Sequence, residues 1–148
     1  MKIYFATDHA GFELKEQLVP YVRNELGYDV TDLGAETFDP TDDYPPYIRL
    51  ASEAVCGDGT ARGIILGGSG QGEAIAANRF PGVRAVVYYG GPDEIITLSR
   101  EHNDANILSL GARFVELEEA KRVIKKWLET EFPREERHLR RIGQIEEK

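Results

Sequence analysis

The segment 67–72, Gly-Gly-Ser-Gly-Gln-Gly, is the most distinctive local feature of the sequence, with four glycines in six residues. Glycine lets backbone N–H groups approach a ligand and lets a turn adopt positive φ. Such N–H groups, together with the start of a following helix, can hold a negatively charged oxygen. The segment lacks both the Gly-Lys-Ser/Thr of a P-loop and the downstream acid of a dinucleotide fingerprint. It predicts an anion-binding loop or, alternatively, only a tight strand-to-helix turn.

Glu73 follows this loop directly and falls in the first turn of the expected helix. A carboxylate beside an oxyanion-stabilising loop suits abstraction of a proton next to a carbonyl group. The alternative is that Glu73 only complements the helix dipole, because acidic residues are common in first turns. The dipole lowers the pKa of a carboxylate, whereas an efficient base needs a raised pKa. We therefore expect desolvation by a bound substrate to raise it.

Two histidines stand beside polar neighbours, His9 after Asp8 and His102 before Asn103. Histidine is the usual acid or base near neutral pH, although a lone histidine is more often structural. The position of His102–Asn103 before an expected strand favours a catalytic role. The three histidines lack the helical spacing of metal ligands, so the sequence predicts no metal site and no cofactor.

The last expected helix carries a basic cluster, which consists of Arg134, Arg137, His138, Arg140 and Arg141. Arg137 and Arg141 are four residues apart and share a helical face. Guanidinium forks suit phosphate oxygens. The alternative is a solvated charged face, diluted by neighbouring glutamates. We interpret the paired acids Asp42 and Asp43, in a polar proline-bearing loop, as solvated.

Apolar runs that alternate with helical patterns must position these side chains. We expect strands over 3–7, 30–33, 63–66, 83–89 and 107–110. We expect helices over 12–26, 48–55, 73–78, 92–100, 117–128 and 135–146. Strands that are apolar throughout and separated by helices imply a parallel sheet covered on both faces. The prediction is an α/β fold, a three-layer Rossmann-like sandwich with a five-stranded parallel sheet.

Ligands of such sheets bind at the carboxyl ends of the strands. We expect three segments there: Asp8–His9, the stretch from Gly67 to Glu73, and the stretch around His102–Asn103.

Composition narrows the class of protein. The 148 residues suit one domain over 1–148, and 41% hydrophobic residues are enough for a core. A formal net charge of −8 disfavours nucleic acid as a partner. A single cysteine, Cys56, excludes an intrachain disulfide. We expect no signal peptide, no membrane span and a cytoplasmic location.

Taken together, these segments resemble the ribose-5-phosphate isomerase type B family, which also includes galactose-6-phosphate isomerase subunits. The resemblance runs from Ile3 nearly to Ile145. Its motifs are ATDHAG (6–11), DYP (43–45), GGSGQGE (67–73), IAAN (75–78), REHN (100–103) and RHLRR (137–141). Some family members carry a catalytic cysteine at the end of the third strand. This sequence has Gly67 there and resembles the subgroup that uses a glutamate base.

The resemblance implies a role for each candidate residue. Glu73 would move the proton between C2 and C1, and the amides of Gly68, Ser69, Gly70, Gln71 and Gly72, with the Ser69 hydroxyl, would stabilise the enediolate. His102, helped by Asp8, would open the sugar ring. Sugar hydroxyls would be bound by Asp8, His9 and Asn103. Phosphate would be bound by Arg113, Arg137 and Arg141, with help from His138.

The family further implies homodimers or tetramers with sites at the subunit interface, so that the helix over about 135–146 would reach a neighbouring subunit. The expected function is metal-independent interconversion of ribose 5-phosphate and ribulose 5-phosphate. Residues 88–92 depart from the family pattern, and a six-carbon aldose phosphate (allose or galactose 6-phosphate) remains the nearest alternative. A non-catalytic sugar-phosphate sensor and a structural subunit of a hetero-oligomer are the alternatives of other classes.

Overall fold

Five parallel strands form one sheet in the order β2-β1-β3-β5-β4 in the computed structural model, which describes residues 1–147. The strands are β1 (Lys2–Thr7), β2 (Asp29–Asp32), β3 (Arg62–Gly67), β4 (Ala85–Tyr88) and β5 (Ile107–Gly111). The central strands β3 and β5 are buried along their whole length, apart from Arg62 at the start of β3. The predicted five-stranded parallel sheet is confirmed.

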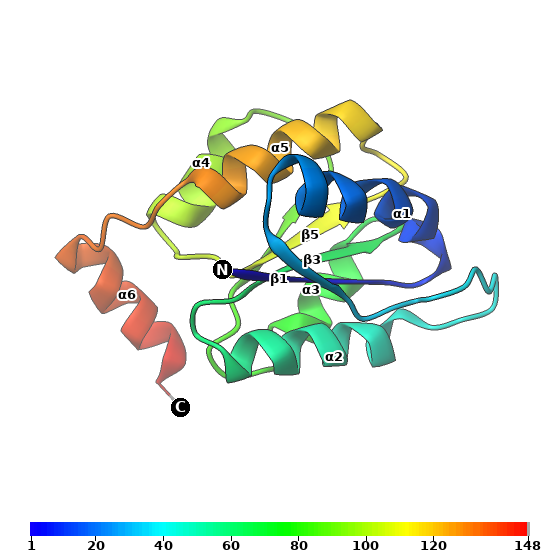
Figure 1. The fold of residues 1–148 in the computed structure, drawn as a ribbon. Helices are drawn as coiled ribbons and strands as arrows, with labels where there is room; N and C mark the ends of the chain where they lie inside the picture. Colours follow the sequence, from blue (N-terminus) through cyan, green and yellow to red (C-terminus); the bar gives the residue numbers. More distant parts are fainter. Residues whose placement is uncertain (148) are drawn as a thin grey trace.

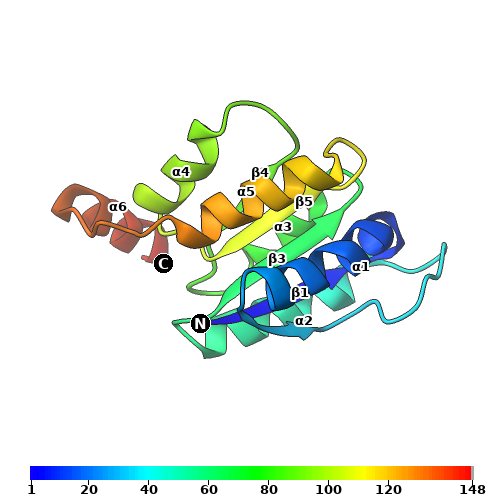
Figure 2. The ribbon, with the colours of Figure 1, turned by 45° about the horizontal axis from the view of Figure 1, so that its top comes forward.

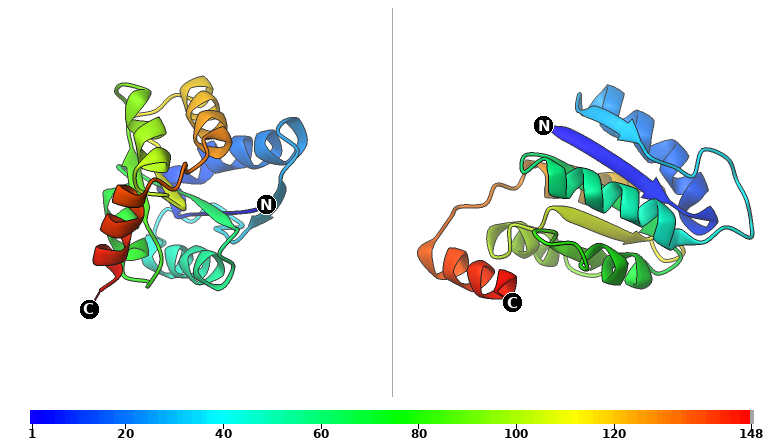
Figure 3. Two further views of the ribbon diagram at one scale, coloured as in Figure 1. Left: turned by 90° about the vertical axis from the view of Figure 1, so that its left-hand side faces the viewer. Right: turned by 90° about the horizontal axis from the view of Figure 1, so that it is seen from below.

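Helices cover both faces of the sheet (Figure 1). One layer contains α1 (Phe12–Pro20), α4 (Glu94–Glu101) and α5 (Leu117–Glu129), and the other contains α2 (Tyr44–Gly57) and α3 (Gln71–Ala77). Figure 3, right, shows α2 and α3 side by side on their face of the sheet. Each layer packs its own apolar cluster against the strands, one centred on Trp127 and Phe5 and the other on Ile48 and Ile65. The predicted three-layer α/β sandwich is therefore confirmed.

Two predicted elements are shorter than their apolar patterns suggest. The helix expected over 12–26 stops at Pro20 and continues as a π-helical turn, Tyr21–Glu25. Proline has no N–H to donate to the preceding turn, so the regular ladder is interrupted there. The strand expected over 83–89 is only β4. Val83 instead donates its N–H to the Phe80 carbonyl in a turn.

The helix α6 (Glu136–Glu146) lies outside both layers, beside the amino ends of the strands (Figures 1 and 2). The Glu146 carboxylate accepts a hydrogen bond of 3.1 Å from the N–H of Gly82 and pairs with Arg84. No helix within residues 1–147 is long and apolar enough to cross a membrane.

Candidate active site

The glycine-rich loop joins β3 to α3 at the carboxyl edge of the sheet and is tied to β5. Gly70 adopts a φ of +76°, a conformation that favours glycine, immediately before α3. Its carbonyl accepts a 2.7 Å hydrogen bond from the buried Ser109 hydroxyl. The carbonyls of Gly67 and Gly68 accept from the N–H groups of Ala112 and Arg113. These contacts tie the loop to β5 and to the turn that follows it.

Glu73 lies in the first turn of α3, and its side chain folds back over the end of β3. The residue is only 4% exposed. A Cβ atom at Gly67 would stand 1.8 Å from the Glu73 Oε1 atom, so the carboxylate occupies space that only glycine leaves open. Burial raises the pKa of Glu73 and outweighs the lowering effect of a backbone hydrogen bond, and the negative charge of Asp8 adds a further, smaller increase. The pKa is therefore raised before substrate binds, and not only through desolvation by substrate.

A cavity of about 340 Å³ opens beside this carboxylate. It is lined by Asp8, His9, Ala10, Tyr44, Gly68, Ser69, Gly72, Glu73 and Arg113. A Cβ at Gly68 would lie 3.0 Å from the Arg113 guanidinium, and one at Gly72 would lie 2.4 Å from the Tyr44 hydroxyl. The two glycines thus allow a cation and a hydroxyl to approach the loop closely.

Asp8 and His9 occupy the turn after β1, and the carboxylate of Asp8 accepts from the N–H of Ala10 at 3.0 Å. Asp42 pairs with His9: its Oδ1 atom lies 2.8 Å from the His9 Nδ1 atom and 2.9 Å from the His9 backbone nitrogen. The interpretation of Asp42 as solvated is wrong, because its side chain is only 8% exposed. The neighbouring Asp43 is exposed, as expected.

Asp8, His9 and Asp42 also form the one group of three possible metal ligands within residues 1–147, with their candidate atoms within 4.8 Å of one another. The Nδ1 atom of His9 already faces the Asp42 carboxylate in a hydrogen bond. A ring N–H that donates to a carboxylate offers no lone pair at that atom. The observed pairing therefore competes with metal ligation through Nδ1.

The remaining predicted site residues lie at the opposite, amino edge of the sheet. His102 ends α4 and Asn103 follows it, four residues before β5 begins at Ile107. The expectation that they extend from the carboxyl end of a strand is wrong, because they precede a strand. The rings of His102 and His138 are stacked with centroids 4.3 Å apart.

This second group includes the basic residues of α6. Arg137 and Arg141 are exposed, whereas His138 is only 3% exposed. The His138 Nε2 atom is buried without a hydrogen-bond partner among residues 1–147. Burial, together with the positive charges of His102 and Arg137, lowers the pKa of His138. The structure therefore gathers the predicted site residues into two groups at opposite edges of one sheet.

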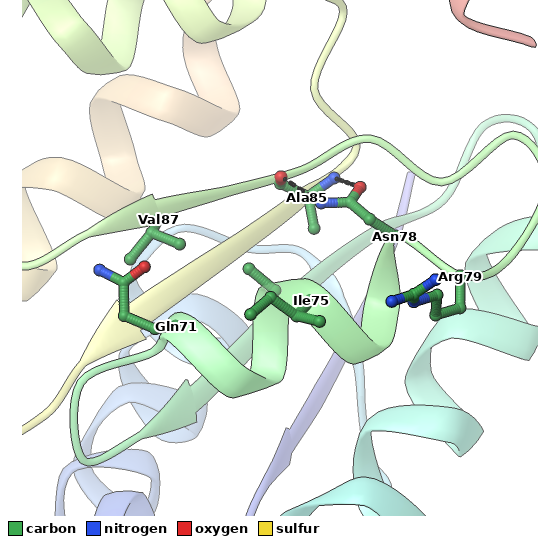
Figure 4. A pocket seen from close by; sticks show the side chains of 7 residues that line it. Gln71, Ile75, Asn78, Arg79, Ala85 and Val87 are labelled. Carbon is green, nitrogen blue, oxygen red and sulfur yellow. Dashed lines mark hydrogen bonds between the residues drawn. The ribbon is translucent and has the colours of Figure 1, made fainter.

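Gln71 belongs to neither group through its side chain. Its backbone N–H donates to the Ser69 hydroxyl at 3.3 Å. Its side chain instead lines a groove between α3 and the edge strand β4, together with Ile75 and Val87 (Figure 4).

The raised pKa of Glu73 predicts a stability that depends on pH. The folded state binds the proton more tightly than the unfolded state, whose glutamate pKa is about 4.3. Stability is therefore lost as pH rises from the unfolded-state pKa through the raised folded-state pKa. Glu73→Gln removes this penalty, so the variant is expected to melt above the wild type at pH 8, with the difference shrinking toward pH 4. Thermal melts across this range measure it, and a lower melting temperature for the variant at pH 8 would contradict the burial argument.

Comparison with known proteins places the chain among sugar-phosphate enzymes. The family model described as Ribose/Galactose Isomerase matches residues 3–145. Ribose-5-phosphate isomerase B of Escherichia coli is 41% identical over 144 residues, covering 97% of this chain and 93% of the relative. The Mycolicibacterium paratuberculosis enzyme of the same name is 38% identical over 147 residues, covering 99% and 91%.

Solved structures agree with the fold. Clostridium thermocellum ribose-5-phosphate isomerase B has a TM-score of 0.91 and 40% identity, covering 99% of this chain and 95% of that one. The Mycoplasma genitalium enzyme, solved with ribulose 5-phosphate bound, has a TM-score of 0.91 and 34% identity, covering 98% and 93%.

Proposed function

Since this chain belongs to the ribose/galactose isomerase family, we propose that it interconverts ribose 5-phosphate and ribulose 5-phosphate. The observation that carries the proposal is the buried carboxylate of Glu73, whose pKa is raised beside a glycine loop that is hydrogen-bonded to β5. A base of this kind can take a proton from a carbon next to a carbonyl group. The relatives named ribose-5-phosphate isomerase B, one with ribulose 5-phosphate bound, support the choice of substrate.

Proton transfer runs through an enediolate. Glu73 removes the proton from C2 of the open-chain aldose, and negative charge develops at the C1 carbonyl oxygen. The proton of the C2 hydroxyl group then passes to the C1 oxygen, which leaves the negative charge on the C2 oxygen. The amides of residues 68–72 and the Ser69 hydroxyl stabilise that oxygen in a fixed geometry. Glu73 then returns its proton to C1, which gives the ketose. Donors of the chain itself supply the stabilisation, so we propose that neither a metal nor a cofactor is needed.

Ring opening and substrate binding use the other predicted residues. His102 acts as the acid that opens the ring, with help from Asp8. Hydroxyl groups of the sugar are bound by Asp8, His9 and Asn103. Arg113, Arg137 and Arg141, with His138, hold the phosphate, since guanidinium groups pair with phosphate oxygens in a forked geometry.

These roles require two copies of the chain, because Glu73 and His102 lie at opposite edges of one sheet. A two-fold axis beside β4 makes the sheets of two copies antiparallel, so the amino edge of one lies next to the carboxyl edge of the other. The groove between α3 and the edge strand β4 is suited to such an interface, because it holds Ile75, which is 62% exposed (Figure 4). We therefore propose a homodimer, alone or paired into a tetramer, in which α6 serves the neighbouring site. A reducing cytoplasm suits the single free cysteine, Cys56.

A panel of sugar phosphates tests the proposal. The purified chain is expected to turn over ribose 5-phosphate with a higher kcat/KM than allose 6-phosphate or galactose 6-phosphate. The family description includes galactose, so equal or better turnover of a hexose phosphate would overturn the pentose assignment. Tight binding of ribose 5-phosphate without exchange of its C2 hydrogen into deuterated water would instead favour a sensor.

Gly67→Ala is expected to lower kcat by about 100-fold, because the new methyl group displaces the Glu73 carboxylate, and misplacement by about 1 Å costs that much. Gly59→Ala is the matched control, since nothing lies within 4 Å of a Cβ at that position. Steady-state kinetics of both folded variants measure the effect. An unchanged kcat in Gly67→Ala would show that the position of Glu73 does not limit the reaction.

A further inference from the structure

We propose that Asp42 is a positioning residue that orients the His9 ring so that its Nε2–H points at the sugar phosphate in the cavity. The inference rests on the proposed function, because it gives His9 a substrate to bind. Asp42 does not line the cavity, whereas His9 does, so Asp42 can act on the substrate only through His9.

The contact itself fixes the orientation of the ring. One oxygen of Asp42 accepts from the backbone N–H of His9 at 2.9 Å and lies 2.8 Å from its Nδ1 atom. An ionised carboxylate can only accept, so the Nδ1 atom carries a proton in this contact. Two bonds to a single oxygen also restrain the turn at His9, because backbone and ring are held together. The Nε2 atom is the ring nitrogen left for the cavity.

Burial explains why this pair favours a charged ring. The Asp42 side chain is 8% exposed, and its second oxygen is buried without a hydrogen-bond partner among residues 1–147. A buried carboxylate with few partners is costly unless a positive charge compensates it. The charged form of His9 supplies that compensation and makes Nε2 a donor as well.

The neighbouring acidic residues also favour the charged form of His9. Asp8 places its Oδ2 atom 4.0 Å from the His9 Nδ1 atom, and Asp39 is a further acid near the ring. The hydrogen bond that the His9 ring donates to Asp42 has the largest effect and raises the pKa of His9 against partial desolvation, and the negative charge of Asp8 raises it further. Arg113 is the cation that lines the same cavity. A charged His9 thus adds a second cation beside Arg113 in the cavity of a protein whose net charge is −8, and its Nε2–H can donate to a hydroxyl oxygen of the anionic sugar.

The tautomer of His9 provides a test that needs no substitution. Long-range ¹H–¹⁵N spectra of the wild type are expected to show neutral His9 protonated at Nδ1, with a titration midpoint above that of a free histidine. A neutral ring protonated at Nε2, or a midpoint at or below the free value, would overturn the proposal.

Kinetics test the function of the pair. Asp42→Asn keeps the shape of the side chain but removes its charge. We expect KM for ribose 5-phosphate to rise about tenfold, the scale of one charge-assisted hydrogen bond, with kcat within about threefold. The pH above which KM increases should move downward, because His9 loses its proton earlier. Glu36→Gln removes an exposed charge from the same loop and should change neither constant.

A double-mutant cycle separates positioning from a general effect on the loop. If Asp42 acts through His9, adding Asp42→Asn to His9→Gln should raise KM no further. Independent, multiplicative effects would overturn the proposal, as would an unchanged KM in Asp42→Asn.

Failure of the proposed function would look different. A wild type without isomerase activity on any sugar phosphate would remove that function. The role of Asp42 would then be tested by the His9 tautomer and by calorimetry. The Kd for ribose 5-phosphate should be about tenfold higher in Asp42→Asn than in the wild type.

Discussion

Replacing Glu73 with glutamine is expected to lower kcat for ribose 5-phosphate by about 100- to 10,000-fold while KM stays within about threefold. The amide has the shape of the carboxylate, so the buried position beside Gly67 can still be filled. It cannot accept the C2 proton. Steady-state kinetics, with deuterium exchange at C2 as a second readout, measure the loss.

Glu13→Gln is the matched control, because Glu13 also lies in the first turn of a helix but is exposed to solvent. It should leave both constants unchanged. An undiminished rate in Glu73→Gln would mean that the assigned mechanism is wrong. A raised KM with unchanged kcat would make Glu73 a binding residue rather than the base.

The two effects expected of Glu73→Gln point in opposite directions, and their combination is informative. A buried carboxyl group lowers the stability of the folded state at any pH at which the group is charged. The same burial raises its pKa toward the range in which a general base works well. A variant that is more stable at pH 8 yet inactive would show that stability is given up at Glu73 for chemistry.

The central part of the fold was predictable because local and global signals agree there. The run 63–66 is apolar throughout, as a strand buried on both faces must be, and β3 covers it completely. The glycines after it mark a turn that no β-branched residue could make. At the edge strand the signal is weaker. Val83 is apolar because it is buried in the cluster around Ile48 and Ile65, not because it pairs in the sheet.

The placement of the candidate site residues was predictable where residues adjacent in sequence are also adjacent in space, as in the loop and Glu73. Asp42 was missed because its contact with His9 spans 33 residues and arises from a loop without periodicity. Tyr44 was missed for a related reason, since it approaches the loop only because Gly72 has no side chain. His102 was assigned to the carboxyl edge of the sheet, but it lies at the amino edge, because it precedes β5. A polar segment close to a strand in sequence can lie at either end of that strand.

The division of the site between two edges makes a dimer the simplest way to unite it. Within one chain, the strands β3 and β5 separate Glu73 from His102. No rearrangement of a loop brings the two together, because both are anchored in helices packed on the sheet. In the proposed dimer, a second copy would supply the missing half without any change in fold.

Subunit mixing tests this arrangement with a large expected effect. Glu73→Gln and His102→Asn homodimers should each be nearly inactive, because every site lacks either the base or the acid. After co-refolding in equal amounts, half of the dimers are mixed, and each mixed dimer has one site with both wild-type residues. The mixture is therefore expected to regain about a quarter of the wild-type activity.

The control is Glu73→Gln mixed with the double variant that carries both substitutions, since no pairing of these chains restores a complete site. Refolding either single variant alone corrects for the handling. Recovery in the first mixture but not in the control requires that Glu73 and His102 of one site come from different chains. If each site were built from one chain, every chain in the first mixture would still carry a defect, and activity would stay at the level of the single variants.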